Sequence, residues 1–291
     1  MKKLLTLLLC LPGLTQAQDD FDDVQITVEE VRDGIYMLQG SGGNIGLSVG
    51  DDGVFIIDDQ FAPLTEKIRS AIARYSREDV QFVFNTHFHY DHTDGNENFG
   101  TGGAIIVAQE NARLRMSLDN FLQVVNVQQE AYDPVGLPKI TFTDSMTLHY
   151  NGHTLNARHF GSGHTDGDTI VKFEEANVIH TGDVFVRYGL PFIDVPNGGN
   201  LNGMIRVMRE LIAWSDDDTL IIPGHGQLSR RQDMVDYAEM LETIRDRVYE
   251  GISAGMSLEA ITAAVPTRDY PASGFLNNAS FTKIAYDSFF Q

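Results

Sequence analysis

Short apolar runs alternate with turn residues over the amino-terminal part of the chain. Four such runs occupy residues 26–31, 35–39, 45–49 and 54–57. Gly, Asp and Asn separate them, as in the turn Asp51-Asp52-Gly53. Runs of this length that are bounded by turn formers are typical of paired β-strands. The pattern therefore predicts a meander of strands.

A different spacing begins after the fourth run. Apolar residues recur at helical intervals over 63–75, and a short apolar run that reads as a buried strand follows at 80–84. Farther along, the same reasoning predicts strands at 105–108, 146–150, 153–160, 169–173, 178–180 and 220–222, and helices at 204–214 and 232–249. No linker rich in Pro, Gly or Ser divides this pattern, so we expect one α/β domain with mixed strands and helices over residues 18–291.

Composition limits the partners of this domain. The chain has 291 residues, of which 42% are hydrophobic, so it can bury a globular core. Its 41 acidic residues outnumber its 21 basic residues, which gives a formal net charge of −20. Such a surface repels nucleic-acid phosphates and anionic lipids. We therefore expect no nucleic-acid partner and, after processing, no membrane partner. We also expect a monomer.

The first 17 residues have the pattern of a secretory signal peptide. Lys2 and Lys3 precede an apolar run at 4–14, and Thr15-Gln16-Ala17 places small side chains at a cleavage site. The run is shorter than the roughly 20 residues that a membrane-spanning helix needs. We therefore expect a periplasmic or secreted protein. Because the single Cys10 lies in this segment, metal ligands in the mature chain would be nitrogen and oxygen atoms.

Residues 85–96, NTHFHYDHTDGN, gather metal-binding side chains in one turn. The segment follows the strand expected at 80–84, and α/β proteins usually bind ligands at the carboxyl ends of strands. His87 and His89 project to the same side because side chains on an extended chain alternate, so they can share one ion. Asp91 and His92 come after the turn and can face a second ion about 3.5–4 Å from the first.

Three further segments place a similar side chain in a glycine-containing turn after an expected strand. They are GSGHTDGD around His164, HTGD ending at Asp183, and IPGHGQ around His225. Glycine permits the tight turns and close backbone approach that a ligand site needs. A single GH or GD would be weak evidence, but four such segments in this order indicate a metal site with two ions.

The order HxHxDH, GHT, GD and GHG resembles the metallo-β-lactamase superfamily of hydrolases, over about residues 25–228. Asp58, in FIIDD, also matches an aspartate that follows a strand in this family. The resemblance implies a four-layer αββα sandwich with two zinc ions at one edge. It also implies the ligand assignment: His87, His89 and His164 for the first zinc, Asp91, His92 and His225 for the second, Asp183 bridging both, and Asp58 orienting ligands without touching a metal.

Two zinc ions with a bridging hydroxide would suit the hydrolysis of a carbonyl substrate. Zinc lowers the pKa of bound water to about 7, so the nucleophile would be available at neutral pH. One ion would polarise the carbonyl, and the other would stabilise the departing nitrogen, oxygen or sulfur. We expect Asp91 to handle a proton in this reaction.

Features near the expected site leave the substrate open. Asn200, in GGNL just before a helix, resembles the substrate-contacting asparagine of the β-lactamases, where it would stabilise an oxyanion. Arg187 and Tyr188 follow the Asp183 turn and could bind a substrate carboxylate. However, the best-known β-lactamases carry a cysteine where Asp183 stands, and a bridging aspartate is typical of glyoxalase II. We therefore expect β-lactamase activity first, a thioesterase or lactonase as the alternative, and a noncatalytic zinc-binding module as a remote third possibility.

The remaining segments receive simpler interpretations. We expect the loop 185–196, which contains Gly and Pro, to form a wall of the pocket. Outside the ligand set, we expect the other histidines to be surface or hydrogen-bonded residues; they are His149, His153, His159 and His180.

Export gives the first testable prediction. Protein purified from its native host should begin at Gln18, because cleavage is expected after Ala17. Thiol reagents should then leave it unlabelled, because the only cysteine is removed with the leader. Intact-mass spectrometry checks both statements. A mass that includes Met1 would contradict the export hypothesis.

Overall fold

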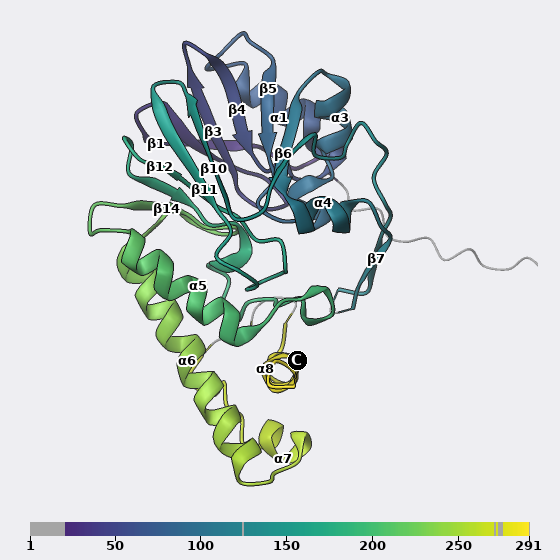
Figure 1. Ribbon diagram of the computed structural model, residues 1–291, viewed down its shortest axis with the longest axis vertical. Helices are drawn as coiled ribbons and strands as arrows, with labels where there is room; N and C mark the ends of the chain where they lie inside the picture. Colours follow the sequence, from purple (N-terminus) through teal and green to yellow (C-terminus); the bar gives the residue numbers. More distant parts are fainter. Residues whose placement is uncertain (1–20, 124, 271, 273–275, 291) are drawn as a thin grey trace, which may run out of the picture.

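Two β-sheets pack face to face, and helices cover both outer faces (Figure 1). A computed structural model describes residues 21–123, 125–270, 272 and 276–290 of the chain. The expected signal peptide at 1–17 lies outside the described residues. This arrangement confirms the predicted αββα sandwich.

The first sheet has seven strands in the order β1-β2-β3-β4-β5-β6-β9. Strands β1 to β4 form the predicted antiparallel meander, and β5, β6 and β9 continue the sheet in parallel. The parallel pairs follow crossovers of the chain, because parallel neighbours cannot be joined by a tight hairpin. The strands are β1 (Thr27–Arg32), β2 (Ile35–Gln39), β3 (Ile45–Gly50), β4 (Gly53–Ile57), β5 (Val80–Phe84), β6 (Ile105–Gln109) and β9 (Ile140–Phe142).

The second sheet has six strands in the order β10-β11-β12-β13-β14-β15. All neighbours are antiparallel except β13 and β14, which are parallel and are separated by a helix in the sequence. The strands are β10 (Ser145–Tyr150), β11 (His153–Arg158), β12 (Ile170–Phe173), β13 (Val178–His180), β14 (Leu220–Ile222) and β15 (Ser229–Arg230). A separate hairpin pairs β7 (Asn120–Leu122) with β8 (Val127–Gln129).

Three apolar layers hold the sandwich together. Side chains such as Phe55 and Phe173 fill the space between the sheets. The outer face of the first sheet packs against α1 (Thr65–Ile72) and α3 (Asn96–Thr101). The outer face of the second sheet packs against long carboxyl-terminal helices, namely α5 (Leu201–Trp214), α6 (Arg231–Ser253) and α8 (Asn278–Asp287). The shorter helices are α2 (Tyr90–Thr93), α4 (Glu110–Met116) and α7 (Leu258–Ala263).

The predicted elements agree with the structure in type, and their ends differ. The helix predicted at 63–75 begins as a 3-10 turn at Ala62–Leu64 and ends as an α-helix at Ile72. The helix predicted from 204 begins at Leu201, because the side chain of Asn200 caps its first turn. The sequence pattern did not predict the β7–β8 hairpin or helix α8. Among the described residues, no helix is long and apolar enough to cross a membrane.

Candidate metal centre

The candidate ligands meet at one edge of the sandwich, where strands from both sheets end. Residues 85–92 follow β5, and Asp58 follows its parallel neighbour β4. From the second sheet, Asp183 follows β13 and His225 follows β14, again a parallel pair. Parallel strands end at the same edge, so the fold itself brings these turns together. His164 enters from the loop between β11 and β12.

The first group contains the three histidines predicted for the first ion. One ring nitrogen from each of His87, His89 and His164 lies within 4.8 Å of the others, and all three side chains are buried. The Nε2 atom of His164 lies 2.9 Å from Nδ1 of His89. The Nε2 atom of His87 is buried without any hydrogen-bond partner. Buried imidazole nitrogens that converge in this way, one of them unsatisfied, fit a metal ion.

The second group contains Asp91, His92 and His225, which also converge within 4.8 Å. The Nε2 atom of His225 lies 3.1 Å from Oδ2 of Asp91 and 3.3 Å from Nε2 of His92. The donors are again nitrogen and oxygen, which suits a divalent ion such as zinc.

Asp183 lies between the two groups. Its Oδ1 atom is 3.1 Å from Nε2 of His92, and its Oδ2 atom is 3.4 Å from Nε2 of His225. The same Oδ2 atom is 3.8 Å from Nε2 of His164, a member of the first group. A carboxylate in this position can contribute one oxygen to each of two ions, which is the arrangement that a bridging ligand needs.

Each of four imidazoles has its other ring nitrogen fixed by a neighbour. The Nδ1 atom of His92 lies 2.8 Å from Oδ2 of Asp58, a carboxylate that also accepts hydrogen bonds from the backbone and hydroxyl of Thr86. Asp58 is fully buried and has the positive φ of 63°, so a strained turn holds it beneath the site. This contact supports the orienting role predicted for Asp58.

Asp194 makes the corresponding contact with His89 and was not predicted from the sequence. Its Oδ2 atom lies 2.9 Å from Nε2 of His89 and accepts a hydrogen bond of 2.8 Å from the side chain of Asn197. His164 donates from Nδ1 to the carbonyl oxygen of Phe192, at 2.8 Å. These bonds leave Nδ1 of His89 and Nε2 of His164 facing the ion site.

Two glycines allow the surrounding loops to approach the ligands. A Cβ atom on Gly43 would lie 2.1 Å from Cε1 of His92, and one on Gly224 would lie 2.0 Å from Oδ1 of Asp183. Both distances are far below a possible contact, so any side chain would displace a ligand. The close approach to Asp183 explains Gly224, the first glycine of the PGHG segment. The sequence pattern associates this glycine only with a tight turn.

The two groups differ in their electrostatics. Burial and the neighbouring imidazoles hold the pKa of His87 well below its ordinary value, and burial beside His89 lowers the pKa of His164 to about 4. Burial opposes the charged form of His225 as well, but Asp183 and Asp91 outweigh it and raise the pKa to about 9. The same carboxylates raise the pKa of His92 against the effect of burial. The second group therefore carries protons that the first group lacks.

A pocket of about 360 Å³ opens onto both groups. His89, Asp91, Asp183 and His225 reach its floor. Its walls are mostly apolar and include Tyr188 and Phe192, so the loop 185–196 forms one wall, as predicted. The other lining residues are Ser41, Phe61, Tyr90, Leu122 and Val125.

Of the three predicted substrate contacts, the structure brings only Tyr188 to this pocket. Its ring lies 5.5 Å from that of His225, and burial raises the pKa of its hydroxyl well above the ordinary value. Arg187 is not among the lining residues; its guanidinium instead pairs with Asp233 of α6, at 2.9 Å. The carboxylate contact predicted for Arg187 is therefore not supported by its position.

Asn200 also lies outside the lining of the pocket. Its side-chain oxygen accepts a hydrogen bond from the backbone of Gly203 at 2.9 Å, and its amide nitrogen donates to the carbonyl of Ser288 at 3.3 Å. The amide is therefore the N-cap of α5, and this helix-capping position replaces the oxyanion contact that we predicted.

The other histidines have the roles expected of them. His180 is buried and hydrogen-bonded to the carbonyl of Asn44, and His153 contacts the carbonyl of Asp33. His149 is exposed, and His159 bonds to the carbonyl of Asp168. None belongs to the ligand groups found among the described residues.

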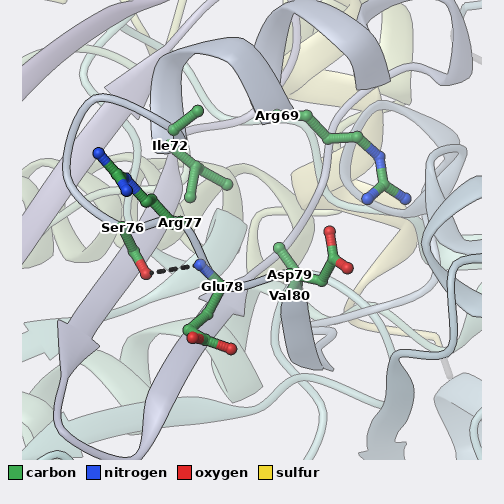
Figure 2. A pocket seen from close by; sticks show the side chains of 8 residues that line it. Arg69, Ile72, Ser76, Arg77, Glu78, Asp79 and Val80 are labelled. Carbon is green, nitrogen blue, oxygen red and sulfur yellow. Dashed lines mark hydrogen bonds between the residues drawn. The ribbon is translucent and has the colours of Figure 1, made fainter.

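A second hollow of similar volume, about 360 Å³, lies where α1 ends and β5 begins (Figure 2). Charges of both signs border it, from Arg69, Arg77, Glu78 and Asp79. None of the candidate ligands lines it. The candidate metal ligands therefore lie away from this hollow, at the edge where the strands end.

Comparison with known proteins agrees with this geometry. Residues 38–225 match the family model of the metallo-beta-lactamase superfamily. The match covers more than half of the chain and includes all seven candidate ligands. The chain belongs to the metallo-beta-lactamase superfamily.

Individual relatives and solved structures are similar to this chain at low sequence identity. A hydroxyacylglutathione hydrolase from Polaromonas sp. is 30% identical over 164 residues, which are 56% of this chain and 55% of that protein. A metallo-beta-lactamase from Pontibacter korlensis superposes with a TM-score of 0.62 at 17% identity and covers 75% of this chain and 99% of its own. A sec-alkylsulfatase from Pseudomonas sp. superposes with a TM-score of 0.68 at 15% identity, over 91% of this chain and 50% of its own. The chain thus spans about half the length of the hydrolase and the alkylsulfatase, and the structural likenesses establish the fold alone.

The contact between Asp194 and His89 predicts a change in metal affinity. Asp194→Asn keeps the shape of the side chain but removes the charge that holds the imidazole, so zinc affinity should fall by about 10- to 100-fold. Competition with a chromogenic chelator measures it. Asp287→Asn, on α8 at the same surface groove, is the control and should leave the affinity unchanged. If Asp194→Asn and Asp287→Asn bound zinc with equal affinity, Asp194 would have no role in the candidate metal centre.

The pKa shifts predict that the two ions bind with different pH dependence. Zinc must displace a proton from His225 below about pH 9, so affinity at the second site should rise with pH toward that value. At the first site the pKa of His164 is about 4, so near pH 7 that histidine has no proton to release. Calorimetry in buffers of different ionisation enthalpy counts the released protons, and His225→Ala should release fewer. The same pH dependence at both sites would contradict the assignment.

Proposed function

We propose that the chain is a dinuclear zinc hydrolase that cleaves an ester, thioester or lactone. One observation carries the proposal: seven His and Asp side chains converge at one edge of the sandwich, four of them reach the floor of a pocket, and Asp183 lies between the two ligand groups. The buried and unsatisfied Nε2 atom of His87 supports an ion at this position. A noncatalytic zinc module would not need the open pocket, or the partly exposed carboxylate of Asp91 beside it.

The residues divide the work of hydrolysis. When bound, two zinc ions supply Lewis acidity, which polarises a carbonyl and makes water acidic enough to act as hydroxide at neutral pH. His87, His89 and His164 would hold the first ion, Asp91, His92 and His225 the second, and Asp183 both. The imidazoles of His92 and His225 hold the pKa of Asp91 at about 2 in spite of burial, so this carboxylate is ionised. Asp91 can therefore accept the proton of the attacking water and return it to the leaving group.

Positions in the pocket favour an ester, thioester or lactone over a β-lactam. The β-lactam prediction depended on Arg187 and Asn200, and neither lines the pocket. A bridging aspartate and the 30% identity to a hydroxyacylglutathione hydrolase support a thioester or a related ester. β-Lactam hydrolysis is the second candidate, because the pattern at 1–17 would place the enzyme in the periplasm or outside the cell, where β-lactams act.

A hydrolysis panel with a metal-ligand variant tests the proposal. The zinc-loaded protein should cleave aryl esters, thioesters or lactones faster than penicillins, cephalosporins or carbapenems. Asp183→Asn removes the shared negative charge, so kcat/KM should fall by more than the roughly 100-fold seen for partners outside the ligand set. Metal analysis should show loss of zinc from the same variant.

The control is Asp246→Asn on the exposed face of α6, which should retain both metal and activity. Full metal content and full activity in Asp183→Asn would contradict the bridging role. A zinc-loaded protein that hydrolyses nothing in the panel would favour the noncatalytic alternative.

A further inference from the structure

The walls of the active-site pocket are aromatic and aliphatic. Phe61 and Tyr90 lie on one part of the rim, with ring centroids 5.6 Å apart. Leu122 and Val125 come from the β7–β8 hairpin, and Tyr188 comes from the loop 185–196.

The position of the last wall residue, Phe192, is tightly determined. Its ring stacks on the imidazole of His89 at 5.5 Å and 16°, and its carbonyl oxygen accepts the hydrogen bond from His164. Phe192 is therefore held by two ligands of the first group. A wall fixed in this way presents the same apolar surface to every substrate, because moving it would disturb the metal ligands.

Among the described residues of this pocket, the side chains that can carry a positive charge are His89 and His225, and bound zinc would occupy both of them. None of the described residues that line it is Lys or Arg. Nearby cations have partners of their own: Arg187 pairs with Asp233, Arg115 with Asp166, and Lys283 of α8 with Asp287. The charged groups that do line the pocket, apart from histidines, are the carboxylates of Asp91 and Asp183.

An anionic substituent on the substrate would therefore be costly to bind. Moving a carboxylate from water to an apolar wall without a hydrogen-bonded partner is strongly unfavourable. A carboxylate drawn toward the ion site instead would compete with the carbonyl group for the same position. The formal charge of −20 on the chain adds a repulsion at longer range.

We propose that the substrate is an uncharged carbonyl compound with an apolar group beside the scissile bond, and that carboxylate-bearing substrates are excluded. This inference depends on the proposed hydrolase function and narrows it. It removes glutathione thioesters and the common β-lactams, which carry carboxylates, from the preferred substrates. Neutral esters, thioesters and lactones with an alkyl or aryl group remain.

A matched pair of esters separates charge from size. In para-nitrophenyl 6-methylheptanoate, the acyl chain ends in an isopropyl group, and the half-ester para-nitrophenyl adipate replaces it with a carboxylate of the same shape. The leaving group is unchanged. With the zinc-loaded enzyme, kcat/KM for the neutral ester should exceed that for the adipate by about tenfold or more. The difference should persist in high salt, about 0.5 M, if desolvation and not long-range charge is its main cause.

Variants of the β7–β8 hairpin test whether the wall is responsible. Val125→Arg places a cation in the pocket and should raise the relative kcat/KM for the adipate about tenfold. Val125→Met adds length without charge and should keep the wild-type preference. Phe121→Arg adds the same charge to an exposed position of the same hairpin that does not line the pocket, and it should also keep that preference.

The outcomes separate this inference from the proposed function. If neither ester nor any other member of the hydrolysis panel is cleaved, the hydrolase proposal itself is wrong. If esters are cleaved and the adipate is as good as the neutral ester or better, the hydrolase stands and the uncharged-substrate inference is overturned. The inference is also overturned if Phe121→Arg shifts the preference as much as Val125→Arg, because charge anywhere on the hairpin would then be sufficient.

Discussion

Seven candidate metal ligands are held close together at one edge of the sandwich, and without an ion their burial is unfavourable. Burial and three neighbouring imidazoles push the pKa of His87 well below its ordinary value, and its Nε2 atom has no hydrogen-bond partner. An unsatisfied buried group of this kind costs roughly 1–3 kcal/mol. Only a rigid framework can keep it in place. The framework consists of two pairs of parallel strands, β4 with β5 and β13 with β14, whose carboxyl ends meet at one edge.

Bonds on the outer side of the imidazoles complete this framework, and they link the metal centre to the pocket. Asp58 reaches His92 from the end of β4, whereas Asp194 and the carbonyl of Phe192 reach His89 and His164 from the loop 185–196. The same loop supplies Tyr188 and the ring of Phe192 to the wall. A shift of this loop would therefore change both the orientation of two ligands and the shape of the substrate pocket. In the proposed hydrolase, substrate binding and metal binding would therefore be coupled through this one segment.

The sequence predicted the layers of the fold and the His and Asp side chains that converge at its edge, because both produce local patterns. Alternating apolar runs identify the strands, and HxHxDH is dense enough to be read without knowing what surrounds it. Asp194 has no such pattern: it is one aspartate in an irregular loop, and its partner His89 lies 105 positions earlier. Arg187 could not be placed for the same reason, since its partner Asp233 lies on a helix much later in the chain.

Asn200 is a different kind of error. Its position before a helix is predicted correctly, but an asparagine there is also a good N-cap, and the local role is the simpler explanation. The β7–β8 hairpin was not predicted, because its strands are three residues long and its side chains alternate too briefly to form a pattern.

The parts that the sequence pattern specifies poorly are those that select the substrate. Strand ends determine where the ions would lie, and changes there would remove the chemistry altogether. The hairpin residues Leu122 and Val125 add an apolar side to the pocket. Leu122 is buried in a small apolar cluster with Phe88, which lies between His87 and His89, whereas Val125 is only partly buried at the edge of that cluster. Substitutions at Val125 can therefore alter the charge or width of the pocket with little effect on the candidate ligands. Phe192 does not have this freedom, because its backbone and ring both contact the first ligand group. Within one pocket, Val125 of the hairpin is thus free to vary with the substrate, and the side formed by Phe192 is constrained by the candidate metal ligands.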